Sequence, residues 1–297
     1  MILKYVNKIR AKISIFSSKK TKNLLDGTYQ SVYKGKSLNF ENLRDYDLND
    51  DIKDIDWKSS TRSASLLVKQ YIAEKKYNVM FVIDSGLKMS GSTLDGTIKK
   101  DIALYSAGTL AYITISNGDY MGMIFNTKGK VKFYPFKLNL YSLENYLNEY
   151  DKNSCLENNL TVNDLLKYTY RNIKKNMIIF VITDNKGLSS IEPKTLKELA
   201  MLHETMFINI EDAYMFGDNV FDIDDDRYVP SALSHDKELL KYEQDLRKNM
   251  FKKYSTLIRK NKMSIVSIKG MNEINDKIVE LLESYRYGNN RWIKRHV

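Results

Sequence analysis

Residues 79–84 read Val-Met-Phe-Val-Ile-Asp, and residues 177–184 read Met-Ile-Ile-Phe-Val-Ile-Thr-Asp. Both segments are almost wholly apolar, and each ends in an aspartate. Continuous apolar runs of this length are typical of strands that are buried on both faces of a parallel sheet. We therefore expect two central strands whose carboxyl ends carry Asp84 and Asp184.

Strand-like and helix-like patterns alternate along the rest of the chain. We expect a strand at 66–71 leading towards the first central strand, further strands at 120–125, 131–134, 206–210 and 263–268, and helices at 98–116, 142–149, 162–172, 193–202, 236–260 and 272–285. Such alternation builds right-handed βαβ units on one sheet. The sequence thus predicts an α/β fold with a doubly wound, mostly parallel sheet.

The two terminal aspartates suggest a binding site. In a doubly wound sheet, ligands bind beyond the carboxyl ends of the strands, where the strand order reverses. If Asp84 and Asp184 are neighbours there, two carboxylates face one crevice, which is costly unless a cation neutralises them. Mg²⁺ would do so through oxygen ligands. The alternative is that each aspartate only caps the loop that follows it.

Three loops resemble those of a von Willebrand factor A domain. They contain Asp84-Ser85-Gly86-Leu87-Lys88, Leu160-Thr161 and Thr183-Asp184. In that family the loops form a metal-ion-dependent adhesion site, whose first loop reads Asp-x-Ser-x-Ser and supplies two serine ligands. The resemblance aligns Thr161 with the threonine of the second loop and Asp184 with the aspartate of the third.

The first loop departs from that pattern because Gly86 and Lys88 stand at the two serine positions. Two hydroxyl ligands are lost, and an ammonium group in the site would repel Mg²⁺. We expect Lys88 either to act as a built-in cation paired with Asp84 and Asp184 or to point into solvent. The result is a degenerate adhesion site without a cofactor, in which Asp84, Thr161 and Asp184 would be the ligands if Mg²⁺ binds.

The polar stretch before the first buried strand carries a second resemblance. It contains Leu43-Arg44-Asp45-Tyr46, Asn49-Asp50-Asp51, Ile55-Asp56-Trp57 and Ser60-Thr61-Arg62. These motifs resemble the hallmark segment of the DUF58 family (domain of unknown function 58), which reads roughly Arg-x-Tyr, Asp-Asp, Ile-Asp-Trp and Ser-x-Arg and precedes a von Willebrand factor A-like domain. From the residue types we expect a half-buried Trp57 in a polar framework fixed to the sheet, or alternatively a contact surface.

The resemblance and the charge pattern divide the chain into four parts. These are a basic amphipathic helix in 1–26, the hallmark segment in 27–76, the von Willebrand factor A-like domain in 77–285 and a basic tail in 286–297. The net charge is +10, but the basic excess lies in the two ends of the chain. The near-neutral body lacks the basic patch of a nucleic-acid-binding protein, so we expect no nucleic acid partner.

The first helix has apolar residues on one side and lysines on the other. The apolar stripe consists of Ile2, Val6, Ile9, Ile13 and Phe16. We expect this stripe to dock on the body, and weak contact with an anionic membrane is the alternative. No apolar run is long enough to span a bilayer, and a single cysteine suits a reducing compartment. The expected location is the cytoplasm.

Motifs of the common enzyme classes are missing from the sequence. It contains no phosphate-binding loop, nucleophile elbow or dinucleotide fingerprint, and its three histidines lack metal-ligand spacing. We therefore expect a non-catalytic protein-interaction or adaptor module, and the resemblance implies a MoxR-type AAA+ ATPase as its partner. The alternatives are a peripheral membrane protein and a Mg²⁺-dependent phosphohydrolase that uses Asp84 and Asp184.

Overall fold

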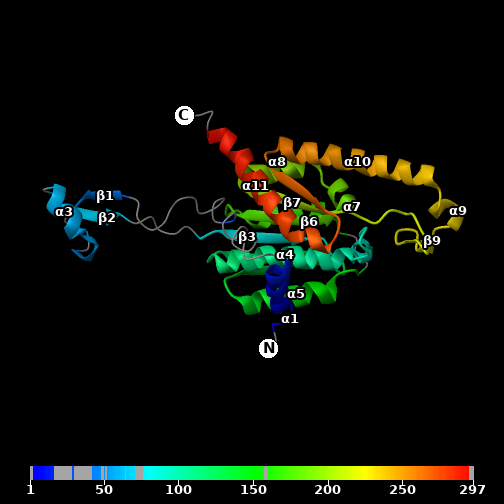
Figure 1. Ribbon diagram of the computed structural model, residues 1–297, viewed down its shortest axis with the longest axis horizontal. Coiled ribbons are helices and arrows are strands. Elements are labelled where there is room, and N and C mark those ends of the chain that lie inside the picture. Colours follow the sequence, from blue (N-terminus) through cyan, green and yellow to red (C-terminus); the bar gives the residue numbers. More distant parts are fainter. Residues whose placement is uncertain are drawn as a thin grey trace.

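A six-stranded sheet forms the centre of the computed structural model, which describes residues 3–16, 29, 42–47, 50, 52–63, 65–70, 76–156 and 160–293 (Figure 1). Along the chain its strands are β3 (Asn78–Ile83), β4 (Tyr120–Thr127), β5 (Lys130–Lys137), β6 (Ile178–Asp184), β7 (Glu204–Ile210) and β10 (Ser264–Ile268). Their spatial order is β10-β7-β6-β3-β4-β5, and only the β4–β5 pair is antiparallel. This is the order of a doubly wound sheet, which confirms the predicted fold class.

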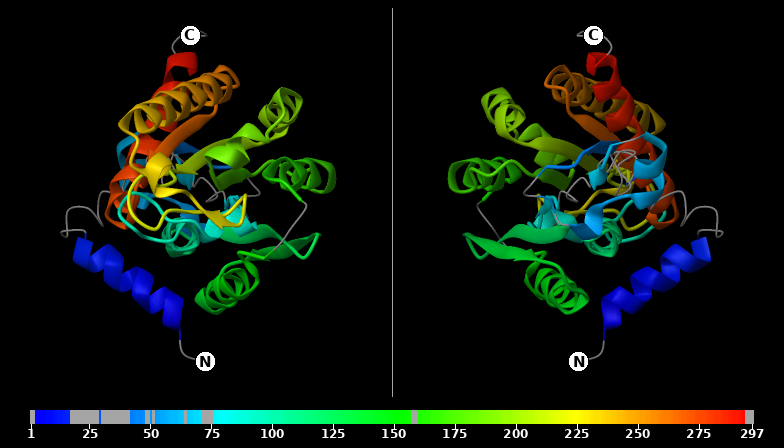
Figure 2. Two further views of the ribbon diagram at one scale, coloured as in Figure 1. Left: turned by 90° about the vertical axis from the view of Figure 1, so that its right-hand side faces the viewer. Right: turned by 90° about the vertical axis from the view of Figure 1, so that its left-hand side faces the viewer.

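Helices cover both faces of the sheet (Figure 2). One layer consists of α4 (Lys99–Ser116), α5 (Leu140–Asn153) and α11 (Ile274–Ile293), and the other of α6 (Val162–Asn172), α8 (Pro193–Leu202) and α10 (Lys237–Lys260). Alternate residues of each strand point into the two cores, so that Phe81 packs with the first layer and Val82 with the second. Burial on both faces explains why the central strands are apolar at every position. The helix α11, which follows η3 (Met271–Glu273), runs into the segment predicted as a basic tail.

The N-terminal helix α1 (Lys4–Phe16) lies against α4 and α5 (Figure 2). Its stripe residues Val6, Ile9 and Ile13 are at most 4% exposed. Both carboxylate oxygens of the buried Glu144 accept hydrogen bonds from the Tyr5 backbone N–H, at 3.0 and 2.9 Å, and one of them also from that of Val6 at 2.9 Å. The structure therefore places the apolar stripe on the body. Ile2 and the side chain of Phe16 lie outside the described residues.

The hallmark segment forms a small module of its own, which stands apart from the sheet in Figure 1. It consists of β1 (Asn42–Asp45), η1 (Ile52–Asp54), α3 (Trp57–Ser63) and β2 (Leu67–Gln70), and β1 pairs with β2 in an antiparallel sheet separate from the central one. Trp57 is 60% exposed. The expectations of a half-buried Trp57 and of a framework fixed to the sheet are therefore wrong, whereas the strand predicted at 66–71 is confirmed as β2. A two-stranded module with a core around Ile55 and Val68 is too small to bury an indole.

Within the module, the Arg44 guanidinium pairs with the Asp50 carboxylate, and Asp56 Oδ1 accepts a hydrogen bond of 3.1 Å from the Ser59 N–H at the start of α3. The Tyr46 N–H donates to the Leu66 carbonyl at 2.9 Å. The Arg62 side chain is exposed, and Asp51 lies outside the described residues. These contacts are local, so they account for the folding of the module.

Residues 213–246 form a projection at the far end of the molecule, which we call the arm (Figure 1). It contains β8 (Phe221–Asp222), β9 (Arg227–Tyr228), α9 (Ser231–Ser234) and the first turns of α10. The sequence predicted the helix at 236–260 but none of the elements before it, because two-residue strands and a four-residue helix are too short to show a period. Among the described residues, no helix combines the length and apolar character needed to cross a membrane.

Candidate functional site

Asp84 and Asp184 meet at the point where the strand order reverses. Asp84 directly follows β3 and Asp184 ends β6, and these parallel strands are neighbours in the sheet. Asp84 is 3% exposed and Asp184 is 1% exposed. The structure therefore brings the two predicted carboxylates together in a buried position, where a compensating cation is required.

Backbone and hydroxyl donors fix the orientation of both carboxylates. Asp84 Oδ1 accepts from the Gly86 N–H at 3.2 Å, and Asp84 Oδ2 accepts from the Thr183 hydroxyl at 2.8 Å. Asp184 Oδ1 accepts from the Gly187 N–H at 2.8 Å, in the first turn of α7 (Asn185–Ser189). A Cβ atom at Gly187 would lie 1.8 Å from Thr183 Oγ1, so only glycine allows α7 to approach this closely.

Lys88 supplies a cation between the two aspartates. It lies in η2 (Leu87–Ser90), and its Nζ is 2.9 Å from Asp84 Oδ2 and 3.3 Å from Asp184 Oδ1. Burial lowers the pKa of Lys88, but the two carboxylates more than offset this and hold the pKa above its ordinary value. The ammonium is therefore charged, and its side chain keeps 25% of its surface exposed.

A second lysine, which the sequence reasoning missed, completes the cluster. Lys99 at the start of α4 is 2% exposed, and its Nζ lies 2.8 Å from Asp184 Oδ2 and also pairs with Asp212. Two sequence signals could have revealed it. The helix dipole disfavours a lysine in the first turn of an otherwise apolar helix, and Asp212 closely follows a third strand of the sheet. We call Asp84, Lys88, Lys99, Asp184 and Asp212 the aspartate–lysine site.

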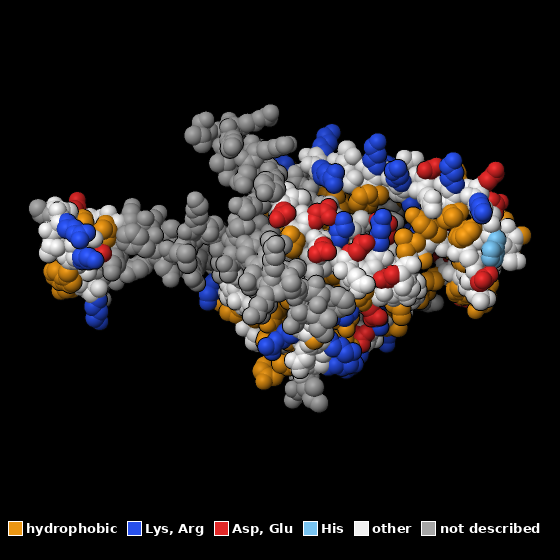
Figure 3. Space-filling view, viewed as in Figure 1, with side chains coloured by type: hydrophobic (Ala, Val, Ile, Leu, Met, Phe, Trp, Pro, Cys, Tyr) orange, Lys and Arg blue, Asp and Glu red, His pale blue; other side chains and the backbone are white. Residues whose placement is uncertain are grey.

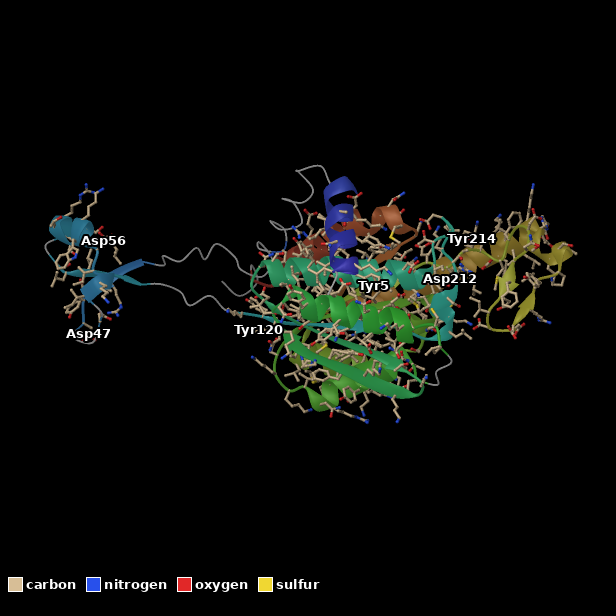
Figure 4. The ribbon with its side chains drawn as sticks, turned by 90° about the horizontal axis from the view of Figure 1, so that it is seen from below. Tyr5, Asp47, Asp56, Tyr120, Asp212 and Tyr214 are labelled. Carbon is tan, nitrogen blue, oxygen red and sulfur yellow. The ribbon has the colours of Figure 1, made fainter. Side chains whose placement is uncertain are left out.

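The carboxylates of this site differ in their electrostatic environment. Burial alone would raise the pKa of Asp184, but the ammonium groups of Lys99 and Lys88 lower it to about 2. Burial raises the pKa of Asp212 above its ordinary value, although Lys99 opposes this effect. The guanidinium of Arg247 donates to the backbone carbonyls of Asp212, at 2.7 Å, and Ala213, at 3.0 Å. Figure 4 shows Asp212 and Tyr214 where the arm joins the body.

Two residues predicted for the site point elsewhere. The Ser85 hydroxyl is buried and donates to Asn126 Oδ1 at 2.5 Å. Thr161 is exposed and caps α6, where its hydroxyl donates to Asp164 Oδ2 at 2.8 Å. A Cβ atom at Gly86 would lie 3.6 Å from Asp84 Oδ1 and 4.0 Å from Lys88 Cε, so this position has room for a side chain.

The residues of the site do not fit Mg²⁺. The Lys88 ammonium lies between the carboxylates that would ligate the ion, both serine hydroxyls are missing, and the Thr161 hydroxyl is bonded to Asp164. The described part of the chain contains no group of three or more His, Cys, Asp or Glu side chains arranged to hold a metal. With three aspartates and two lysines, the site contains one more acidic group than basic groups.

Comparison with known proteins identifies the family. The model of a family described as "Protein of unknown function DUF58" matches residues 42–216, which is more than half of the chain. The chain belongs to the DUF58 family. No curated protein matches it. The match covers the hallmark module and the part of the domain that contains Asp84, Thr161 and Asp184, in the order that the sequence predicted.

Solved structures similar to this DUF58 protein include domains of the von Willebrand factor A type. The conserved hypothetical protein BatB from Bacteroides thetaiotaomicron has 15% identity over 70% of this chain and 98% of its own, with a TM-score of 0.47. An aerotolerance-related membrane protein from Bacteroides fragilis has 11% identity over 70% and 99%, with a TM-score of 0.44. The SpRpn10 VWA domain has 9% identity over 69% and 94%, with a TM-score of 0.40.

Proposed function

We propose that this DUF58 protein is a non-catalytic interaction module in which lysine takes the place of the adhesion-site metal. The observation that supports this proposal is the position of the Lys88 and Lys99 ammonium groups on Asp84, Asp184 and Asp212. The lysines neutralise most of the buried negative charge, so that the surface at this edge of the sheet is preformed without an ion.

Within the site, Lys88 is the residue that would contact a partner. An ammonium group has three N–H donors, and two of them face Asp84 and Asp184. Because a quarter of the side chain is exposed, the third donor is available to a partner carboxylate. Leu87, Leu94 and Ile98 surround this position in the sequence and are 41–46% exposed. A charged group with exposed apolar residues close to it in the chain suits a protein interface.

The pairing of the aspartates supports a binding role over catalysis. A general acid or base works best with a pKa near the operating pH. The pKa of Asp184 is about 2, and both of its oxygens already accept hydrogen bonds or ion pairs. A phosphohydrolase would also need a metal that these residues do not fit. The membrane alternative is not favoured, since the described stripe residues of α1 are buried on the body.

The partner we propose is a MoxR-type AAA+ ATPase, which the resemblance to the DUF58 family implies, with this chain acting as an adaptor in complex assembly. The test is co-purification of the full chain with the MoxR-type ATPase of the same organism, with and without EDTA. We expect binding that EDTA does not change and that Leu94→Asp weakens. Met201→Asp is the matched control, because Met201 is 81% exposed on α8. Lack of binding, or binding abolished by EDTA, would contradict the proposal.

A further inference from the structure

The arm exposes an unusual amount of apolar surface. Its large side chains with 36–68% exposure are Met215, Phe216, Phe221, Tyr228, Leu233, Leu239, Tyr242 and Leu246. Figure 3 shows hydrophobic side chains gathered where α10 leaves the body towards α9. Contiguous apolar patches on a soluble protein mark places where another molecule binds.

Part of this surface is a regular stripe on one helix. Leu239, Tyr242 and Leu246 follow one another at spacings of three and four residues, which places them on one face of α10. Their exposed fractions are 44%, 68% and 48%. An apolar helix stripe of this kind is normally covered, and in the described structure this one faces solvent.

The arm is held in place by specific hydrogen bonds. The Ala213 N–H donates to the Ser92 carbonyl at 2.8 Å, and the Met215 N–H donates to Glu243 Oε2 at 3.0 Å. The Gly217 N–H donates to the Ser234 carbonyl at 2.9 Å. The apolar side chains are therefore presented on an anchored scaffold, which lowers the conformational entropy that the arm itself loses when a partner binds.

The charge of the arm indicates the chemistry of the partner. Residues 213–246 contain nine acidic and three basic residues, in a chain whose net charge is +10. Asp218, Asp224, Asp225 and Asp226 are exposed beside the apolar side chains. Three of these acids have partners within the protein: Asp224 pairs with Lys186, Asp225 with Arg227, and Asp218 lies 3.1 Å from Nε2 of His235. A surface that is both acidic and apolar repels anionic lipid. It attracts a protein surface that is both cationic and apolar.

We propose that the arm is a docking surface for a basic amphipathic helical segment of a partner protein. Apolar residues on such a helix would cover the stripe of α10, and its lysine or arginine residues would face the aspartates of the arm. The inference rests on the proposed function only in that both require a protein partner, because the arm and the aspartate–lysine site are separate surfaces with separate variants.

The test uses a fluorescein-labelled Leu–Lys peptide of about 18 residues, which forms roughly five turns of amphipathic helix. A Leu–Glu peptide with the same pattern and a scrambled Leu–Lys peptide serve as controls. Fluorescence anisotropy on the full chain is expected to show binding of the Leu–Lys peptide only. Tyr242→Asp combined with Leu246→Asp should weaken this binding about ten-fold or more. Met201→Asp, at a more exposed apolar residue on α8, should leave it unchanged.

A charge reversal provides the second variant. Asp225→Lys with Asp226→Lys should weaken binding of the Leu–Lys peptide and strengthen binding of the Leu–Glu peptide, and added salt should weaken both effects. Equal binding of the three peptides, no effect of the arm variants, or self-association of the chain that Tyr242→Asp abolishes would overturn the inference. Lys88→Ser should not change peptide binding. If the chain binds the peptide but not the ATPase, the docking role of the arm is supported and only the proposed function is rejected.

Discussion

Replacing Lys99 by methionine tests how strongly the buried ammonium stabilises the protein. Lys99→Met keeps most of the side-chain volume and removes the charge that pairs with Asp184 and Asp212. Lys99 is 2% exposed and Asp184 is 1% exposed, so the lost pairing is not replaced by water. Removing one partner of a buried ion pair costs about 3–5 kcal/mol of unfolding free energy. A loss of this size corresponds to a decrease of about 10 °C in Tm.

The neighbouring residue provides the control. Lys100 lies next to Lys99 on α4, but the side chains of its ion pair with Asp151 are 23% and 32% exposed. Lys100→Met should therefore cost less than about 1 kcal/mol. Urea unfolding followed by circular dichroism measures both variants. Equal losses for the two substitutions would refute the reasoning, because they would show that burial does not distinguish the two ion pairs.

The pH dependence of the same experiment adds an independent check. In the wild type, Asp184 has a pKa of about 2 in the folded protein, below its ordinary value, so its contribution to stability is complete above about pH 4 and is lost as the pH falls towards 2. In Lys99→Met, the Asp184 carboxylate lacks this cation, and its protonation removes the cost of an unpaired buried charge in the folded state. The difference in unfolding free energy between the two proteins should therefore shrink as the pH falls.

Four further substitutions test other parts of the fold. Burial, with a smaller effect of Lys174, lowers the pKa of His203 to about 4, so the unfolding free energy should fall by up to about 3 kcal/mol between pH 6.5 and 4. The His203→Phe variant should lack this part of the loss. A difference in unfolding free energy between wild type and variant that stays constant with pH would contradict this expectation. Glu144→Ala leaves the backbone donors of α1 without their acceptor, so we expect a loss of about 1–3 kcal/mol and faster proteolysis of residues 1–16, and unchanged protease resistance would argue against it. Gly187→Ala should cost about 1–3 kcal/mol or more in urea unfolding, because its Cβ overlaps Thr183, whereas Gly86→Ala has room and should be nearly neutral; similar costs for both would be inconsistent with the packing of α7.

The parts of the fold that the sequence predicted are those whose cause is local. The strands β3 and β6 are buried on both faces, so each position must be apolar and the run is visible in the sequence. The aspartates that end these strands could be placed together because parallel strands end at the same edge of the sheet. The pairing of Lys88 with both carboxylates follows from that placement and from the four-residue spacing to Asp84.

The parts that the sequence did not predict depend on tertiary contacts. Lys99 and Asp212 are 113 residues apart, and the local signal at each position does not by itself say which residue it pairs with. Thr161 has the residue type of a metal ligand, but in this chain its hydroxyl is used by the capping box with Asp164. Trp57 was expected to be half-buried because large aromatic residues usually are, whereas its module contains too little structure to cover it.

A Mg²⁺ titration followed by calorimetry tests whether lysine replaces the metal of the adhesion site. The wild type is expected to show no Mg²⁺ binding in the millimolar range, since the Lys88 ammonium lies on Asp84 and Asp184. Gly86→Ser combined with Lys88→Ser restores the two hydroxyl ligands and removes the charge, so this variant is expected to bind Mg²⁺. Tight Mg²⁺ binding by the wild type that Asp84→Asn abolishes would contradict this role of lysine.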